Sequence, residues 1–482
     1  MLFNSIDFIV FLVIVFFIYW FVVNKNIRSQ NLFILIASYI FYGWWDWRFL
    51  SLIIFSSFVD FYVGKALKTE GRDEIRKLLV LVSVVVNLGL LIAFKYYNFF
   101  IDSFVSAFSF FGYTMETNRL RIILPVGISF YTFQTLSYSI DVYRKKIKAT
   151  TDFVAFFAFV SFFPQLVAGP IERASNLLPQ FSTPRKFNYD HAVEGTRQIL
   201  WGLFKKIVIA DHCATYSNVI FNNYGDYSGS TLFLGAFFFT FQIYGDFSGY
   251  SDIAIGTAKL FGFKLMQNFA FPYFSRNIAE FWRRWHISLS SWFRDYLYIP
   301  LGGSRVQRSK QIRNIFIIFL VSGFWHGANW TFIVWGLIHS LLFLPSFFVK
   351  GNRRYIDIIA SHRIIPPVNE IAKMVSTFCL IVLSWVFFRS QNIKQAFSII
   401  GEIFSTSLFT LPNYPDETKA QSTIYMIIVM LVIEWLGRKK DFALAELNSR
   451  IKMPFRHLLY YSLLYTILWF SNVQQTFIYF QF

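Results

Sequence analysis

Two histidines are the strongest candidates for chemistry in this sequence. His326 lies in a Gly-Phe-Trp-His-Gly motif within residues 314–349, a stretch without Asp, Glu, Lys or Arg. So long an apolar run predicts membrane-embedded structure, where a titratable side chain costs free energy unless it is paired or reaches a watery cavity. His326 is therefore either a functional residue or a histidine that bonds a carbonyl of a neighbouring helix. His339, beside Ser340, fits the structural role better.

The second histidine, His286, lies in residues 280–300, which are rich in aromatic residues and arginines. If this segment is one helix, Arg283, His286, Ser290 and Arg294 fall on one face and the aromatic residues on the other. The pattern is typical of an interfacial helix, with its cations in water, and also of a polar face that reaches a reaction centre. Both interpretations can hold together.

As a pair, the two histidines suit proton transfer from an alcohol. A hydroxyl is a weak nucleophile until a base within hydrogen-bond reach takes its proton. Burial lowers the pKa of an imidazole and so keeps it available as a base. We therefore interpret His326 as the general base of an acyl transfer and His286 as an auxiliary that orients substrate or stabilises charge. Gly323 and Gly327, on either side of His326, allow another helix or a thin ligand chain to approach closely.

Two further segments place polar residues among apolar ones. Residues 244–252 contain Asp246, Ser248 and Asp252, and buried carboxylates need cationic partners. A structural ion pair is the favoured interpretation and substrate contact the second, with partners expected among Arg283, Arg284 and Arg294. Gln134 lies in an apolar segment that could line a wet channel, although such polar groups often bond only the preceding turn.

The composition predicts one large integral membrane domain. Hydrophobic residues make up 55% of the 482 residues and charged residues 15%, and 63 phenylalanines exceed what one globular core needs. Basic residues cluster in short segments between apolar runs, which accounts for the net charge of +18 without nucleic-acid binding. Lys25 and Arg28 follow the first apolar run, so we expect the N-terminus outside and most of the basic loops in the cytoplasm.

We therefore predict an all-α polytopic fold of about ten to thirteen membrane helices. The domain is expected to span residues 1–482, with N-terminal helices in 1–112, a motif-bearing catalytic core in 113–345 and C-terminal helices in 346–482. Two prolines and a glycine within residues 162–173 predict a broken, re-entrant element that lines an internal cavity. The expected apolar segments are 8–23, 31–45, 48–64, 78–96, 98–112, 122–143, 152–169, 194–212, 231–262, 314–349 (more than one element), 371–389, 421–437 and 457–479.

Other chemistries find no support in the sequence. Cys213 and Cys379 lie far apart, which indicates neither a disulfide framework nor a thiolate metal site. The sequence contains no Gly-x-Ser-x-Gly, no phosphate-binding loop with lysine and no His-Glu-x-x-His. We predict no metal site, and covalent serine hydrolysis, nucleotide hydrolysis and zinc catalysis are disfavoured.

These motifs, in this order, resemble those of the membrane-bound O-acyltransferase (MBOAT) family, and most closely its bacterial alginate O-acetyltransferase branch. The resemblance covers nearly the whole chain. It rests on Leu-Pro-Val-Gly-Ile-Ser-Phe at 124–130 with Gln134, Phe-Pro-Gln-Leu-Val-Ala-Gly-Pro-Ile at 163–171, Tyr-Gly-Asp-Phe-Ser-Gly-Tyr-Ser-Asp at 244–252, Phe-Trp-Arg-Arg-Trp-His at 281–286 and Gly-Phe-Trp-His-Gly at 323–327.

The resemblance implies a ring of membrane helices with re-entrant segments, in which funnels from the cytoplasmic and outer sides meet at His326. It implies acetyl-coenzyme A as a donor substrate, with no bound cofactor, and a multi-pass protein of the bacterial inner membrane. The acceptor would be an extracytoplasmic polysaccharide such as alginate, another exopolysaccharide or peptidoglycan, reached through an SGNH-hydrolase-like partner. We expect the catalytic residues to be His326 and His286 and the substrate-binding residues to be Trp325, Gly327, Asn329, Trp282, Arg283, Arg294, Gln134, Asp246 and Ser248.

Two alternatives stay open at this point. Within the family, the competitor is D-alanyl transfer to teichoic acid from a carrier protein, although residues 385–389 and the apolar segments after them resemble the alginate branch. From another class, a solute transporter or channel without acyl chemistry would also have broken helices and polar residues at the membrane midplane. Our inference from charge alone is that Arg283 and Arg294 suit the phosphates of the donor.

Overall fold

The computed structural model describes residues 1–113, 119–120, 123–167, 169–349, 351, 354–414, 417–447 and 451–478. Every regular element within these ranges is a helix, as predicted. The chain divides into two compact units: unit 1 comprises Met1–Gly195 and Thr257–Met266, and unit 2 comprises Thr196–Gly256 and Gln267–Phe482. The predicted single domain with its three regions stays a prediction. Ala168 of the expected break, Lys350 and Arg353 of an expected basic loop, and the expected end of the last span at 479 lie outside the described residues.

Unit 1 is built mainly from the N-terminal apolar segments. In chain order its helices are α1 (Ile6–Phe17), the π-helix η1 (Ile18–Val22), α2 (Ile27–Asp46), η2 (Trp47–Phe49), α3 (Leu50–Thr69), α4 (Asp73–Leu91), η3 (Ile92–Tyr96), α5 (Tyr97–Phe110), α6 (Ile128–Tyr143), α7 (Phe153–Ser161), α8 (Phe163–Leu166), α9 (Ala174–Leu177) and η4 (Leu178–Phe181). It also contains the beginning of α10 (Tyr189–Leu203) and the end of α12 (Gly229–Leu260).

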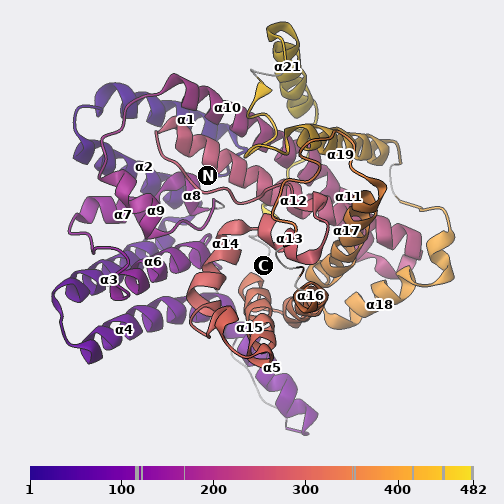
Figure 1. Ribbon diagram of the computed structural model, residues 1–482, viewed down its shortest axis with the longest axis horizontal. Coiled ribbons are helices and arrows are strands. Elements are labelled where there is room, and N and C mark those ends of the chain that lie inside the picture. The colour runs from indigo at the N-terminus through magenta and orange to yellow at the C-terminus, as the bar shows by residue number, and fades with distance from the viewer. Residues whose placement is uncertain are drawn as a thin grey trace. The chain divides into compact units, whose positions relative to one another are not determined.

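A buried carboxylate joins three helices of unit 1. Asp60 of α3 accepts hydrogen bonds from the hydroxyls of Ser83 in α4 and Ser139 in α6, each at 2.5 Å, and from the amide of Asn87 in α4 at 2.7 Å. Figure 1 shows α3, α4 and α6 side by side. Because a buried polar group is tolerated where its hydrogen bonds are made, this cluster fixes the packing of the three helices.

The predicted break in residues 162–173 is present in unit 1. α7 ends at Ser161, and Phe162 leaves the helical conformation (φ −51°, ψ 106°) before α8 begins. The amide of Phe163 donates to the hydroxyl of Ser38 in α2 at 3.1 Å. Protein therefore satisfies a backbone group that the break releases, as membrane-embedded backbone requires. The expected role of this segment in lining a cavity stays a prediction.

Unit 2 contains both histidines of interest. Its elements after α10 are the π-helix η5 (Phe204–Ala210), α11 (Asp211–Asn222), η6 (Tyr224–Asp226), most of α12, η7 (Pro272–Phe274), α13 (Ile278–Arg284), α14 (Ile287–Phe293), the π-helix η8 (Arg294–Tyr298), η9 (Gly303–Arg305), α15 (Arg308–His326), α16 (Trp330–Phe348), α17 (Val368–Arg389), α18 (Ile393–Ile403), η11 (Thr406–Phe409), α19 (Glu417–Gly437) and α21 (Met453–Trp469). The expected division of 314–349 into more than one element is confirmed by α15 and α16.

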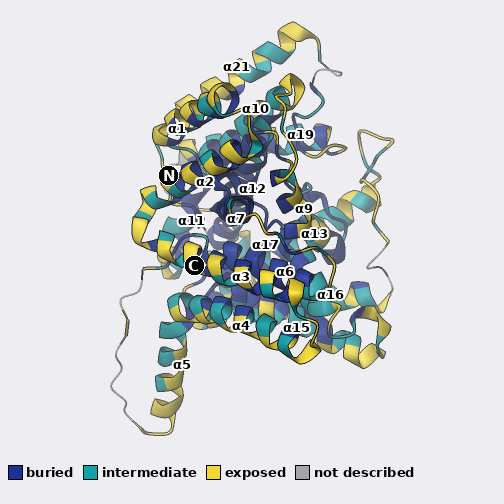
Figure 2. Ribbon diagram, turned by 90° about the vertical axis from the view of Figure 1, so that its left-hand side faces the viewer, coloured by how far each residue is buried: buried dark blue, intermediate teal, exposed yellow. Residues whose placement is uncertain are grey.

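Several helices are apolar enough to cross a membrane. Within the described ranges, five stretches meet the length and composition of a span: Ile27–Thr69, Asp73–Phe110, Trp330–Phe348, Val368–Arg389 and Thr418–Gly437. Figure 2 shows exposed residues along helices such as α1, α5 and α21, and in α21 only Leu463 and Ile467 are buried. Exposed apolar side chains in such rows are expected to face lipid. The predicted number of spans stays a prediction.

Candidate active site

His286 lies at a sharp break between two short helices of unit 2. α13 ends at Arg284, and α14 begins at Ile287. Between them Trp285 is extended and His286 adopts the left-handed conformation (φ 44°, ψ 55°), which is uncommon for residues other than glycine. The amide of Ile287 donates to the carbonyl of Asn268 at 2.9 Å, which holds the break in place.

The prediction of one continuous helix over residues 280–300 is therefore wrong. Backbone pairing with residues 268–270 replaces helical bonds at the break: besides Ile287, the amide of Ala270 donates to the carbonyl of Arg284 at 3.0 Å. As a consequence, His286 is fully buried whereas Arg283 and Arg294 are exposed, and the three do not form a shared polar stripe.

The side chain of Asn268 orients the His286 ring. His286 Nδ1 lies 3.1 Å from Asn268 Oδ1, and Asn268 Nδ2 donates to Ser251 Oγ at 3.1 Å. The hydroxyl of Ser288 donates to the same Oδ1 at 2.9 Å. Because an amide oxygen only accepts, Nδ1 must carry the proton, and a neutral His286 then has its lone pair on Nε2. Asn268 was not predicted from the sequence, where it appears as a single asparagine in a loop.

His326 is the last residue of α15, in a tight hairpin of α15 with α16. A Cβ on Gly323 would lie 2.2 Å from the carbonyl oxygen of Phe332, and one on Gly336 would lie 2.3 Å from that of Phe319. Gly323 therefore serves helix packing, the more ordinary of the two roles expected for it. Gly327 leaves the helix in an extended conformation and packs against the Phe332 ring.

The two histidines lie close together in unit 2. The ring centroids of His286 and His326 are 6.4 Å apart, with the ring planes inclined by 58°. Aromatic side chains surround them: Trp325 lies 5.9 Å from the His286 ring, and Trp335 and Phe388 lie 5.2 and 5.3 Å from the His326 ring. Imidazoles at this separation can both reach one small reacting group.

A cavity of about 850 Å³ opens next to this pair. Ser322 lines it, one turn before His326 on α15, which corresponds to about 6 Å along the helix axis. Trp282, in the last part of α13, lines it as well, and α13 ends two residues before His286. The cavity also reaches Arg294 and Arg305, so it connects cationic side chains with the neighbourhood of the histidines. Its volume lies within the usual range for ligand sites, about 300–1,000 Å³.

Trp282 and Asn329, which were predicted to bind substrate, make hydrogen bonds within the protein. Trp282 donates from Nε1 to Nδ1 of His339 at 3.2 Å, and Ser384 Oγ lies 3.1 Å from the other ring nitrogen, which supports the expected structural role of His339. Asn329 caps α16, accepting from the amide of Thr331 at 3.0 Å, and donates to the carbonyl of Gln391 at 2.8 Å. The contacts of Asn329 are thus structural, and substrate binding by Asn329, Trp325 and Gly327 stays a prediction.

Asp246 and Asp252 form the expected ion pairs, but with different partners. Lys206 Nζ lies 2.7 Å from Asp246 Oδ1, and Lys205 Nζ lies 2.6 Å from Asp252 Oδ2 and donates to Ser248 Oγ at 2.9 Å. The expected pairing with Arg283, Arg284 or Arg294 is therefore wrong. The adjacent lysines inside the predicted span 194–212 are the feature of the sequence that indicates these pairs.

Asp246 also binds a segment from much later in the chain. The amide of Ile478 donates to Asp246 Oδ2 at 2.6 Å, and Lys206 Nζ donates to the carbonyl of Gln475 at 3.1 Å. The Phe477 ring lies 6.2 Å from that of Phe247, which in turn lies 4.6 Å from the His286 ring. The motif at 244–252 therefore supports the wall behind His286.

Gln134 belongs to unit 1 and not to the compact unit that holds the histidines. It is buried in α6, and its amide donates to the carbonyl of Phe159 in α7 at 2.7 Å. This contact is structural, and a role for Gln134 in substrate binding stays a prediction.

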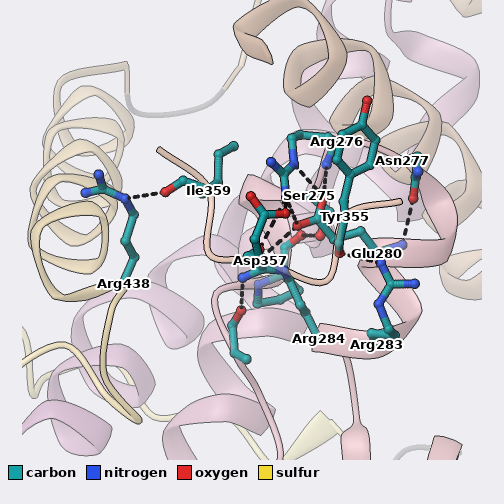
Figure 3. Close-up of polar contacts among 12 residues, drawn as sticks. Ser275, Arg276, Asn277, Glu280, Arg283, Arg284, Tyr355, Asp357, Ile359 and Arg438 are labelled. Carbon is teal, nitrogen blue, oxygen red and sulfur yellow. Dashed lines mark hydrogen bonds and ion pairs between the residues drawn. The ribbon is translucent and has the colours of Figure 1, made fainter. Parts of the chain in front are cut away.

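A cluster of charged residues anchors α13, the helix that precedes His286 (Figure 3). Glu280, fully buried, accepts from Arg276 Nε at 3.0 Å and lies 2.7 Å from a terminal nitrogen of Arg284. Arg276 also pairs with Asp357 at 3.1 Å, and Arg283 donates to the carbonyl of Tyr355 at 2.6 Å. Arg283 therefore holds the loop before α17 and does not line the cavity.

Arg438, the residue after the end of α19, continues this anchoring. Its guanidinium donates to the carbonyls of Ile359, Ala360 and Arg363 at 3.0, 2.8 and 2.7 Å. Arg276, Glu280 and Arg438 were not predicted as parts of the site. Among the described residues, no group of three or more His, Cys, Asp or Glu side chains could hold a metal ion.

Comparison of the sequence with known proteins identifies the family of this chain. Residues 49–388 match the profile of the membrane-bound O-acyltransferase family, MBOAT. The chain belongs to this family. The MBOAT chain is 40% identical over 419 residues to a Pseudomonas aeruginosa protein named probable alginate O-acetylase, covering 86% of this chain and 78% of that protein. It is therefore a multi-pass membrane O-acyltransferase.

Two other relatives of the MBOAT chain are named for different substrates. The peptidoglycan O-acetyltransferase of Helicobacter pylori is 34% identical over 429 residues, covering 83% of this chain and 79% of that protein. The teichoic acid D-alanyltransferase of Bacillus subtilis is 29% identical over 247 residues, covering 49% of this chain and 62% of that protein. The MBOAT chain thus resembles the O-acetylating relatives over a larger share of its length.

Proposed function

We propose that this enzyme transfers an acetyl group from acetyl-coenzyme A in the cytoplasm across the membrane, for the O-acetylation of an extracytoplasmic polysaccharide. The observation that carries the proposal is the placement of His286 and His326, 6.4 Å apart, with His326 one helical turn from Ser322 in the wall of a cavity that has cationic side chains. A cavity of about 850 Å³ suits a long, flexible thioester better than a bulky polymer.

The charges around the cavity support a phosphorylated donor. Arg294 and Arg305 line it, and the backbone of Gly302 and Gly303 leaves room beside them. Arg305 begins the basic segment 305–313, which the positive-inside bias assigns to the cytoplasm. Phosphates bound at these arginines would leave the acyl end of the donor directed toward Ser322 and His326.

The chemistry assigned to the two histidines is a direct acyl transfer. His326 takes the proton of the acceptor hydroxyl, and the hydroxyl oxygen attacks the thioester carbonyl. The C–S bond then breaks, and the leaving thiolate takes up the proton from His326. His286, with its lone pair on Nε2, accepts a hydrogen bond and so orients the hydroxyl group.

The acceptor side of the proposal rests on the relatives. The relatives that are 40% and 34% identical are named for O-acetylation of alginate and of peptidoglycan, so the acceptor is proposed to be a polysaccharide of this kind. An SGNH-hydrolase-like partner would receive the acetyl group outside the membrane and pass it to the polymer. The enzyme would lie in the bacterial inner membrane with its N-terminus outside.

D-alanyl transfer from a carrier protein is the second candidate, and the relationship to the Bacillus subtilis enzyme favours it. That match covers 49% of the chain, compared with 86% for the alginate relative, so acetyl transfer is the better supported reaction. Transport of a solute without chemistry, the alternative from another class, does not fit membership of an acyltransferase family.

The test is transfer of radiolabelled acetyl from acetyl-coenzyme A in membrane vesicles that contain the enzyme. His326→Ala should abolish thioester consumption and label transfer, and His362→Ala, which removes an exposed histidine, should leave both unchanged. Transfer that persists in folded His326→Ala would refute the assignment of the base. Label from a D-alanyl carrier protein, with none from acetyl-coenzyme A, would favour the second candidate.

A further inference from the structure

Besides the cavity in unit 2, the structure has a pocket of about 340 Å³ in unit 1. It lies where the end of η1, the loop before α10 and the end of α12 meet, and its wall includes Trp20, Arg185, Lys186 and Lys259. Trp20 donates from Nε1 to the carbonyl of Leu260 at 2.9 Å, which joins two of these segments. The proposed acyl transfer assigns no role to this pocket.

Arg185 gives the pocket a fixed positive charge. Its guanidinium donates to Asn31 Oδ1 at 2.6 Å and to the carbonyl of Gln180 at 3.2 Å, and it lies 4.7 Å from the centroid of the Phe263 ring. All these partners are neutral, so they orient the cation without cancelling its charge. In the described part of the chain, neither Arg185 nor Lys186 forms an ion pair with a carboxylate.

The neighbouring groups add to the preference for an anion. Lys259 is paired with Glu194 at 2.5 Å, so it contributes donors and little net charge. Asn188 and His191 line the pocket, and Asn188 Oδ1 accepts from the amide of His191 at 3.0 Å at the start of α10. The amino-terminal end of a 15-residue helix therefore faces the pocket, and such an end favours negative charge.

The surroundings of the pocket are apolar and exposed. Phe17, Phe21 and Val22 at the end of the apolar stretch Ile6–Val22 are more than half exposed, and so is Tyr189. Phe187, half exposed, packs edge-on against Trp20 with 5.5 Å between the ring centroids. Aromatic residues of this kind are enriched where a membrane helix meets the headgroup layer.

We propose that this pocket binds the phosphate headgroup of an anionic phospholipid. Arg185, Lys186 and the start of α10 bind the phosphate, and the acyl chains lie along the exposed side chains of η1. A soluble phosphate would use the cations but would leave these apolar side chains without a partner. The combination of a cationic pocket and an exposed apolar border therefore favours a lipid.

The test is native mass spectrometry of the delipidated full chain, titrated in detergent with dioleoyl-phosphatidylglycerol or dioleoyl-phosphatidylcholine. One phosphatidylglycerol should bind at least about tenfold more tightly than phosphatidylcholine, and inorganic phosphate in excess should not displace it. Lys186→Glu should weaken phosphatidylglycerol binding about tenfold, since Lys186 is exposed and its reversal changes the charge by two.

The matched control is Lys68→Glu, which reverses an exposed lysine in the last turn of α3, outside the pocket. It should leave binding unchanged. Equal loss in both variants would overturn the proposal, because the lipid would then respond to diffuse charge. Equal binding of phosphatidylcholine would overturn it too, and displacement by inorganic phosphate would show a site for soluble anions. Lys186→Gln, with a smaller loss than Lys186→Glu, provides a second measurement.

Discussion

The His286 and His326 rings lie 6.4 Å apart, and the residues that hold them are different in kind. His286 is fixed by a hydrogen bond to Asn268, whereas aromatic rings of Trp335 and Phe388 surround His326. The amide of Asn268 therefore orients the His286 ring, and two aromatic rings pack against the His326 ring. Variants of Asn268 and of the cavity wall test these contributions separately.

Asn268→Ala should lower kcat about 10- to 100-fold and leave KM for acetyl-coenzyme A unchanged. The variant frees the His286 ring to rotate and to exchange tautomers, but Asn268 does not line the donor cavity. Steady-state kinetics in vesicles give both constants. Asn222→Ala, which changes an exposed asparagine of the same unit, is the control. A rise in KM without a fall in kcat would contradict a positioning role.

Ser322→Phe should block the donor cavity one turn before His326 and reduce acetyl transfer to background. The added ring fills space that the thioester must cross. Val321→Phe is the matched control, because Val321 is the neighbouring residue and is 39% exposed. Binding of acetyl-coenzyme A, measured by calorimetry, should be lost only in the Ser322 variant. Normal turnover in Ser322→Phe would place the donor elsewhere.

Gly323→Ala should destabilise the protein by about 1–3 kcal/mol, because its Cβ would lie 2.2 Å from the Phe332 carbonyl oxygen and force α15 and α16 apart. Gly401→Ala in α18 meets no atom within 4 Å and should be neutral or slightly stabilising. Thermal unfolding in detergent compares the two. Equal melting temperatures of the two variants would mean that α15 and α16 can move apart without loss of stability.

Glu280→Gln should cost about 1–3 kcal/mol of stability, because it removes the closest anion of buried Arg276 and weakens the hold on Arg284, while Asp357 and Glu370 still pair with Arg276. Asp102→Asn, at an exposed ion pair with Arg119, should change the melting temperature little. Because α13 leads into His286, kcat should also fall in Glu280→Gln. A variant with normal stability would show that the cluster in Figure 3 is dispensable for folding.

The sequence predicted the helical elements well where the apolar pattern was long. The first expected segment, 8–23, corresponds to Ile6–Val22, and the segment 371–389 corresponds to Val368–Arg389. These predictions succeeded because length and hydropathy are local properties of the chain.

The break at His286 could not be predicted in the same way. The helical pattern of 280–300 is strong, but bonds between Ile287 and Asn268 override it. The ion pairs of Asp246 and Asp252 were expected with arginines because Lys205 and Lys206 lie inside an apolar segment. In both cases the deciding partner is distant in sequence, so local periodicity does not contain the information.

The left-handed backbone of His286 limits how its function can be probed. At φ 44° most side chains strain the main chain, so His286→Ala would remove the imidazole and also disturb the break. Asparagine tolerates this conformation much better. A loss of activity in His286→Asn can therefore be attributed to the missing ring nitrogen. A loss of activity in His286→Ala would combine the effect of the missing ring with that of the disturbed backbone.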